Sequence, residues 1–118
     1  MIALTLAMLV APAPVLADIG PEPTMEDFAA VAEPALAGKV KPRQPVTFKW
    51  PYKLVAGPAG YYTCGLASST KKSSRVKDVW VSAVVAHGQA VNVQWSTMNG
   101  MLAYLCKKGV RDGTIAAR

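Results

Sequence analysis

Apolar side chains recur at intervals of three and four residues near the start of the chain, the period of a helix with one buried face. The positions concerned are Met25, Phe28, Ala29, Ala32 and Leu36. Thr24 and Asp27 have the spacing of a weak capping box, and Gly38 is a candidate stop. Pro34 removes a backbone donor. The pattern predicts a helix over residues 25–33, with a further turn beyond a kink as the alternative.

Residues 46–54 show the alternation of a half-buried strand. Its apolar positions are Phe48, Trp50, Tyr52 and Leu54. Pro51 cannot donate to a ladder, so we expect an edge strand, or a strand end, near it. A turn over residues 57–60 leads into a second strand over residues 61–67, and the two should pair as a hairpin. Tyr62, Cys64 and Leu66 share one face of the second strand.

The clearest hairpin joins residues 79–86 to residues 89–95 through His87 and Gly88. A two-residue turn there would place Trp80 opposite Trp95 and Val84 opposite Val91. Val91, Val93 and Trp95 alternate with polar residues, which predicts one apolar face.

Residues 97–108 fit two structures. Met98, Met101, Leu102 and Leu105 have helical spacing, and Gly109 is a natural cap for a helix end. Leu102, Tyr104 and Cys106 also alternate as in a strand, so the strand stays open as the alternative. Residues 112–113 mark a final turn, and residues 114–118 read as a tail.

Residues 1–17 predict a signal peptide. They carry no charge, hold an apolar run from Ile2 to Val10 and end in Val15-Leu16-Ala17, which suits a signal peptidase. The absence of a basic residue before that run leaves open a start codon upstream of Met1. We expect export to the periplasm or outside the cell, where Cys64 and Cys106 would pair as a structural disulfide worth about 4 kcal/mol.

The predicted fold is α+β, with an N-terminal helix, an antiparallel sheet of about four strands, and a C-terminal helix tied to the sheet by that disulfide. The predicted organisation is a signal peptide over residues 1–17, a disordered lead over residues 18–23 and one domain over residues 24–118. Residues 1–17 are too few to cross a bilayer. We also expect no transmembrane span in the chain that remains after the signal peptide is removed.

Charge is unevenly distributed. Five of the seven acids precede residue 34, and all 13 Lys and Arg residues follow it. This division predicts an anionic partner, or an acidic segment that folds back over the basic body. The candidate anion-binding residues are Lys49, Lys53, Lys71, Lys72, Arg75 and Lys77, with Tyr61 and Tyr104 as candidate neighbours. Nucleic acid is not expected as a partner of an exported protein.

Catalytic chemistry finds little support. His87 is the single histidine, which excludes a histidine-pair nuclease, and it belongs to a turn. Asp78 and Asp112 are the only acids of the basic body, and nothing in the sequence requires them to meet. Ser-x-x-Lys occurs at Ser68/Lys71, Ser69/Lys72 and Ser74/Lys77, without the companion motifs of that chemistry. We expect no catalytic residue, no metal site and no cofactor.

The leading function is therefore a non-enzymatic binding domain of the bacterial envelope, for an anionic component or another exported protein. The alternative is a protein-directed inhibitor or accessory subunit. The Tyr61-Tyr62-Thr63-Cys64 segment, in an exported domain of this length, resembles small periplasmic lysozyme inhibitors, although these four residues do not assign a family. A small hydrolase is the least favoured function.

Overall fold

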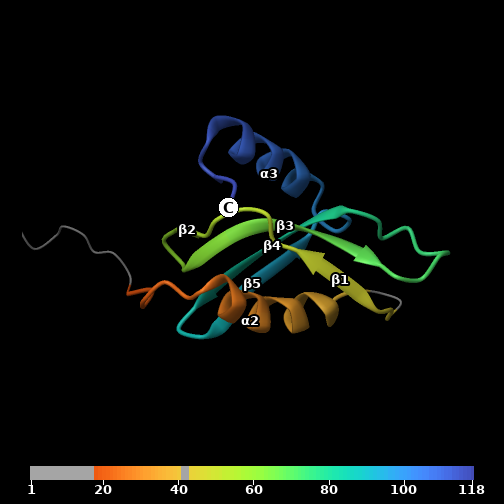
Figure 1. The fold of residues 1–118 in the computed structure, drawn as a ribbon, viewed down its shortest axis with the longest axis horizontal. Helices are drawn as coiled ribbons and strands as arrows, with labels where there is room; N and C mark the ends of the chain where they lie inside the picture. The colour runs from red at the N-terminus through yellow and green to blue at the C-terminus, as the bar shows by residue number, and fades with distance from the viewer. Residues whose placement is uncertain (1–17, 41–42) are drawn as a thin grey trace, which may run out of the picture.

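The computed structural model describes residues 18–40 and 43–118, so the predicted signal peptide lies outside the described residues. Two helices cover opposite faces of one antiparallel sheet (Figure 1). The elements in chain order are α2 (Met25–Ala37), β1 (Val46–Lys49), β2 (Val55–Ala56), β3 (Tyr61–Ser69), β4 (Val79–Ala86), β5 (Gln89–Trp95) and α3 (Gly100–Asp112). The strand order is β1-β3-β4-β5, and β2 also pairs with β3. The predicted α+β fold is confirmed.

Helix α2 begins where the sequence predicts and ends one turn later than residue 33. The Thr24 hydroxyl accepts a hydrogen bond from the Asp27 backbone N–H at 3.0 Å, which caps the helix. The helix continues through Pro34 and ends at Gly38, whose N–H donates to the Pro34 carbonyl. Leu36 is fully buried in that last turn. Its burial offsets the donor that Pro34 lacks, so tertiary packing overrides the local signal.

The predicted edge strand is split at Pro51. β1 ends at Lys49, and the next pairing to β3 starts at Val55. Phe48 and Trp50 pack on the α2 side, as does Leu54, whereas Tyr52 belongs to the cluster on the α3 side. The prediction that Tyr52 shares their face is wrong, because the chain leaves the ladder at Pro51 and the alternation restarts. The predicted turn is confirmed, with the Gly57 N–H donating to the Gly60 carbonyl.

The hairpin of β4 and β5 is confirmed, but its predicted register is wrong beyond the first pairs. Ala86 pairs with Gln89 as a two-residue turn requires, and then a β-bulge shifts the register between Val84 and Val85. Val81, and not Trp80, therefore lies opposite Trp95. A shift of one residue exchanges the two faces of a strand.

Because of this shift, the two tryptophans lie on opposite sides of the sheet. Trp95 is buried in the α2-side cluster, and its indole N–H donates to the Leu36 carbonyl at 2.9 Å. Trp80 stacks on Tyr52 on the α3 side, with ring centroids 6.1 Å apart. Val91, predicted to share the apolar face, is 54% exposed.

Residues 100–112 form a helix, which decides between the two predictions for this segment. The Asn99 side chain caps its start by accepting from the Met101 N–H. Gly113, in the left-handed region with φ of 86°, ends the helix, so the predicted end at Gly109 is wrong. Gly109 instead lies inside the helix against Ile115, where an added Cβ would come within 2.7 Å of that side chain.

The predicted tail returns to the sheet. Ile115 is buried, and the Lys53 N–H donates to the Ala116 carbonyl at 2.7 Å. Arg118 donates from its guanidinium to the Trp50 carbonyl at 2.7 Å and from its backbone N–H to that of Pro51. Residues 116–118 therefore provide backbone hydrogen-bond partners for residues 50–53, which no longer pair with β3.

The predicted disulfide joins Cys64 on β3 to Cys106 on α3. It belongs to a small buried cluster that also holds Leu102 and Ile115. The larger cluster lies between α2 and the opposite face of the sheet, where Phe28, Ala32 and Leu36 are fully buried.

Candidate binding surface

The six predicted cations do not form one site. Lys71, Lys72, Arg75 and Lys77 lie in the loop between β3 and β4, next to the Ser69 end of β3. Lys53 precedes β2, which pairs with the Tyr61 end of β3. At the usual rise per residue, the length of β3 places these two groups on the order of 20 Å apart. Lys53 instead lines a hollow with Glu22 and Arg118 near the start of α2.

One loop cation has a structural role. The Lys77 ammonium donates to the Ser69 carbonyl at 2.9 Å and to the Lys71 carbonyl at 3.1 Å. Ser68 and Asp78 close the base of the loop, since the Ser68 hydroxyl donates to the Asp78 carboxylate and accepts from the Asp78 N–H. This arrangement engages the Lys77 ammonium, whereas no hydrogen bond of this kind within the described residues holds the side chains of Lys71, Lys72 and Arg75, although all four residues are exposed.

The most unusual surface of the described chain lies on α3. Of the five large apolar residues that are mainly exposed, four lie on this helix or just before it. They are Met98, Met101, Tyr104 and Leu105, with exposed fractions between 52% and 60%. Met98, Met101, Leu102 and Leu105 share the predicted helical spacing, but of these four only Leu102 is buried, because the helix turns Leu102 and Cys106 toward the sheet.

Three exposed cations, Lys107, Lys108 and Arg111, follow on the same helix. We call the surface formed by Met98, Met101, Tyr104, Leu105, Lys107, Lys108 and Arg111 the α3 outer face. Of its members, the sequence indicated only Tyr104 as a candidate contact, because the other apolar residues served only to indicate a helix. Since Cys106 must face the sheet to reach Cys64, helical geometry from Cys106 would have pointed the Met101–Leu105 side outward.

Lys108 occupies a central place on this surface. It lies three, four and seven positions after Leu105, Tyr104 and Met101, and these spacings put side chains on one side of a helix. The ammonium thus emerges among apolar neighbours. On the inner side of α3, a hollow of about 370 Å³ lies between the helix, strands β3 and β4 and the returning C-terminal residues, and Leu105 and Lys108 reach its edge.

Asp112 is the one acid on α3, and its carboxylate is already engaged. It accepts a hydrogen bond from the Thr114 backbone N–H at 2.9 Å. This bond, together with the neighbouring charges of Lys108 and Arg111, lowers the pKa of the Asp112 carboxyl below its usual value. The carboxylate therefore holds the turn that follows the helix and balances one of the three positive charges.

The two helices carry opposite charge. Helix α2 bears Glu26, Asp27 and Glu33 and no Lys or Arg, whereas α3 bears three cations and one acid. Glu33 accepts a hydrogen bond from the Trp50 indole N–H at 2.8 Å. The acidic segment does lie against the body, but on the face of the sheet opposite α3 (Figure 1). It leaves the α3 outer face uncovered.

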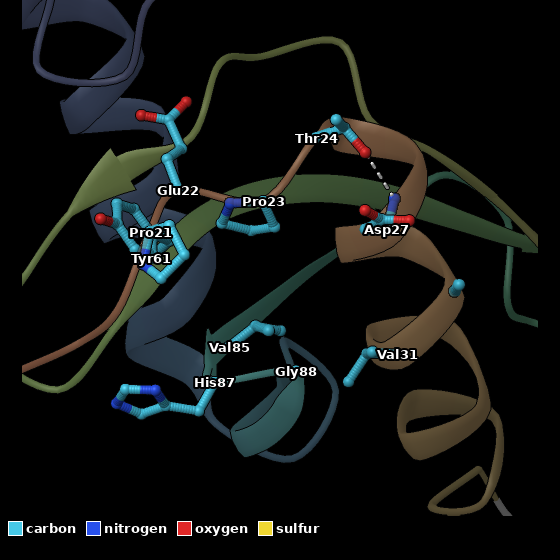
Figure 2. A pocket seen from close by; sticks show the side chains of 11 residues that line it. Pro21, Glu22, Pro23, Thr24, Asp27, Val31, Tyr61, Val85, His87 and Gly88 are labelled. Atoms are coloured by element: carbon cyan, nitrogen blue, oxygen red, sulfur yellow. Dashed lines mark hydrogen bonds between the residues drawn. The ribbon is translucent and has the colours of Figure 1, made fainter.

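A pocket of about 540 Å³ lies between residues 21–24, the first turns of α2 and the β4–β5 turn (Figure 2). Two long-range hydrogen bonds hold the preceding residues in place: the Tyr61 hydroxyl donates to the Gly20 carbonyl, and His87 Nε2 lies 2.8 Å from the Asp18 carbonyl oxygen. Gly20 has φ of 77°, and a Cβ there would come within 2.9 Å of His87 Nδ1. Residues 18–23 thus contact the body without forming a helix or strand.

The titratable residues that line this pocket are Glu22, Asp27, Tyr61 and His87. The imidazole ring of His87 is exposed and points away from α2 in Figure 2. The Thr24 hydroxyl caps α2, and the Tyr61 hydroxyl is bonded to Gly20. Apolar side chains such as Val31 and Val85 form much of the wall. His87 contacts the Asp18 carbonyl and so helps to hold residues 18–23 against the sheet.

Within residues 18–40 and 43–118, no group of three or more His, Cys, Asp or Glu side chains is placed to hold a metal ion. No helix in the same ranges has the length and apolar character needed to cross a membrane. Comparison of the chain with protein-family models, with curated proteins and with solved structures gives no match.

Proposed function

We propose that this protein is an exported, non-enzymatic binding domain that docks on an anionic partner through the α3 outer face. The observation that carries the proposal is the presence of three exposed apolar side chains and three exposed cations on α3, with exposed Met98 just before the helix. Exposed apolar groups that cluster in this way are typical of interaction surfaces, because isolated domains seldom leave them uncovered. The Cys64–Cys106 disulfide is compatible with export.

The distribution of charge favours an anionic partner. The acids of α2 lie across the sheet from α3, so the molecule has a negative and a positive side. Such a separation orients a protein as it approaches a charged surface. Lys49 adds to the positive side: it alternates with Phe48, which packs under α2, and so points toward the α3 face of the sheet.

The α3 outer face differs from the site predicted from sequence, and a matched pair of variants separates them. Lys107, Lys108 and Arg111 would be changed to Glu in one variant. Lys71, Lys72 and Arg75 would be changed to Glu in the control, which alters the net charge by the same amount. All six side chains are exposed, and a thermal melt of each variant establishes that it is folded before binding is compared.

The probe is soluble polyphosphate, with binding followed by fluorescence anisotropy at two salt concentrations. Three cation contacts should weaken roughly 20-fold when salt rises from about 50 to about 200 mM. We expect the α3 variant to lose at least about tenfold more affinity than the loop variant. Equal losses would contradict the assignment to α3. Binding by the parent that does not depend on salt would favour the protein-directed inhibitor.

A further inference from the structure

We infer that the anionic partner is a lipid bilayer surface, on which α3 lies flat with its exposed apolar side chains among the headgroups. This inference rests on the proposed function and names its partner. The α3 outer face combines the two features of an interfacial helix: apolar side chains that enter the headgroup–acyl boundary, and cations that meet anionic lipids.

The apolar side chains favour a bilayer over a soluble polyanion. Met101, Tyr104 and Leu105 are each more than half exposed. A polyphosphate or an acidic glycan offers charge but no apolar surface to cover them. A lipid surface offers both within the depth of one headgroup layer, so a single docked orientation would satisfy the apolar and the basic residues together.

Lys108 favours a bilayer over a protein partner. The centres of protein interfaces are depleted in lysine, because its ammonium would have to be desolvated there. Lys108 emerges among Met101, Tyr104 and Leu105 by helical spacing. At a bilayer, its aliphatic stem covers these neighbours while the ammonium extends to the phosphate layer.

The helix is ready to dock without folding first. The Cys64–Cys106 disulfide and the buried Leu102 hold its inner side on the sheet. A preformed surface avoids the ordering cost that a disordered segment meets on binding. Its 13 residues span about 20 Å along the bilayer plane. The acids of α2 face away from the lipid in this orientation.

The test is flotation of the oxidised mature chain, residues 18–118, with two kinds of vesicle, phosphatidylcholine alone and phosphatidylcholine mixed with phosphatidylglycerol. The parent should float with the mixed vesicles and bind the neutral ones at least about tenfold more weakly. Each cation near an anionic surface contributes about fivefold in affinity, so replacing Lys107, Lys108 and Arg111 by Gln should cost roughly a hundredfold.

The apolar contribution has its own variant and its own control. M101S combined with L105S should lower vesicle affinity about tenfold or more, because two apolar side chains no longer leave water. The same variant should lose clearly less affinity for soluble polyphosphate than for the mixed vesicles, because polyphosphate offers no apolar surface to these side chains. The control is V91S, which removes a side chain of similar exposure from β5 and should leave both affinities unchanged.

The outcomes separate the two proposals. If the double Ser variant, folded by thermal melt, floats as the parent does, the lipid inference is overturned and the proposed function stands. If the parent binds polyphosphate but not the mixed vesicles, the partner is a soluble polyanion and the lipid inference again fails. If the parent binds neither probe at low salt, both proposals fail.

Discussion

The two helices cover opposite faces of one sheet, and the numbers of buried residues beneath them differ widely. On the α2 side, eleven buried residues form one cluster that includes Phe28, Trp50 and Trp95. On the α3 side the buried cluster has four members, and two of them are the cysteines of the disulfide. None of the mainly exposed large apolar residues lies on α2, whereas three lie on α3 itself.

This difference indicates a division of roles between the two faces. The α2 face gains its stability from close packing and from polar groups satisfied within it, such as the Trp50 indole bonded to Glu33. On the α3 face, the Cys64–Cys106 disulfide supplies part of the stability that close packing supplies on the α2 face. The apolar residues of α3 are thereby left outside the core and available for contact.

The largest effect should come from the α2-side core. Trp95→Ala should destabilise the protein by about 3–5 kcal/mol, because the ring is buried and its loss leaves the Leu36 carbonyl without its indole donor. Trp80→Ala should cost less, because Trp80 is only partly buried. Urea unfolding of both variants with the disulfide intact measures the difference. Equal losses would mean that the two faces contribute alike.

The next effect should come from the disulfide. Replacing Cys64 and Cys106 by Ala should cost about 2–4 kcal/mol. The helix α3 should detach from the sheet before the rest of the protein unfolds, since few other buried residues hold α3 to the sheet. Amide hydrogen exchange should therefore accelerate in α3 before it accelerates in α2. A uniform acceleration across both helices would contradict a separate α3 face.

The smallest effect concerns Asp112. Its pKa is lowered in the folded protein by the Thr114 N–H, so the stability gained from its charge is present above its ordinary pKa, near about 4. That contribution is lost as the pH falls through the lower folded value. Asp112→Asn keeps an acceptor but removes the charge. Its melting temperature should lie slightly below the parent's at neutral pH and converge with it in acid.

The β4–β5 hairpin shows how far local pattern predicts a fold. Its strands and turn follow from alternation and from Gly88, yet the pairing of the tryptophans does not. A β-bulge adds one residue to one strand, and no local property of Val84 or Val91 indicates where the shift falls. Its position is decided by which faces α2 and α3 cover, and these contacts join residues far apart in the chain.

The candidate site shows the same limit. The clustering of lysines in sequence predicted a site in the β3–β4 loop and on the edge strand, but the fold separates Lys53 from Lys71 and Lys72. The α3 outer face remained hidden because an amphipathic pattern tells which residues are apolar and not which side of the helix is covered. The covered side was decided by the link from Cys106 to β3.

The sequence by itself determined most of the elements and their order, the caps at Thr24 and Gly38 and the cysteine pair, because periodicity, capping and the presence of only two cysteines are local or compositional properties. Only the tertiary structure decided the register across the bulge, the side of the sheet for Tyr52 and Trp80, and the choice of a helix at residues 100–112, which leaves Met101 and Leu105 exposed. The reason is that burial depends on what packs against a residue, and here the packing partners come from distant parts of the chain.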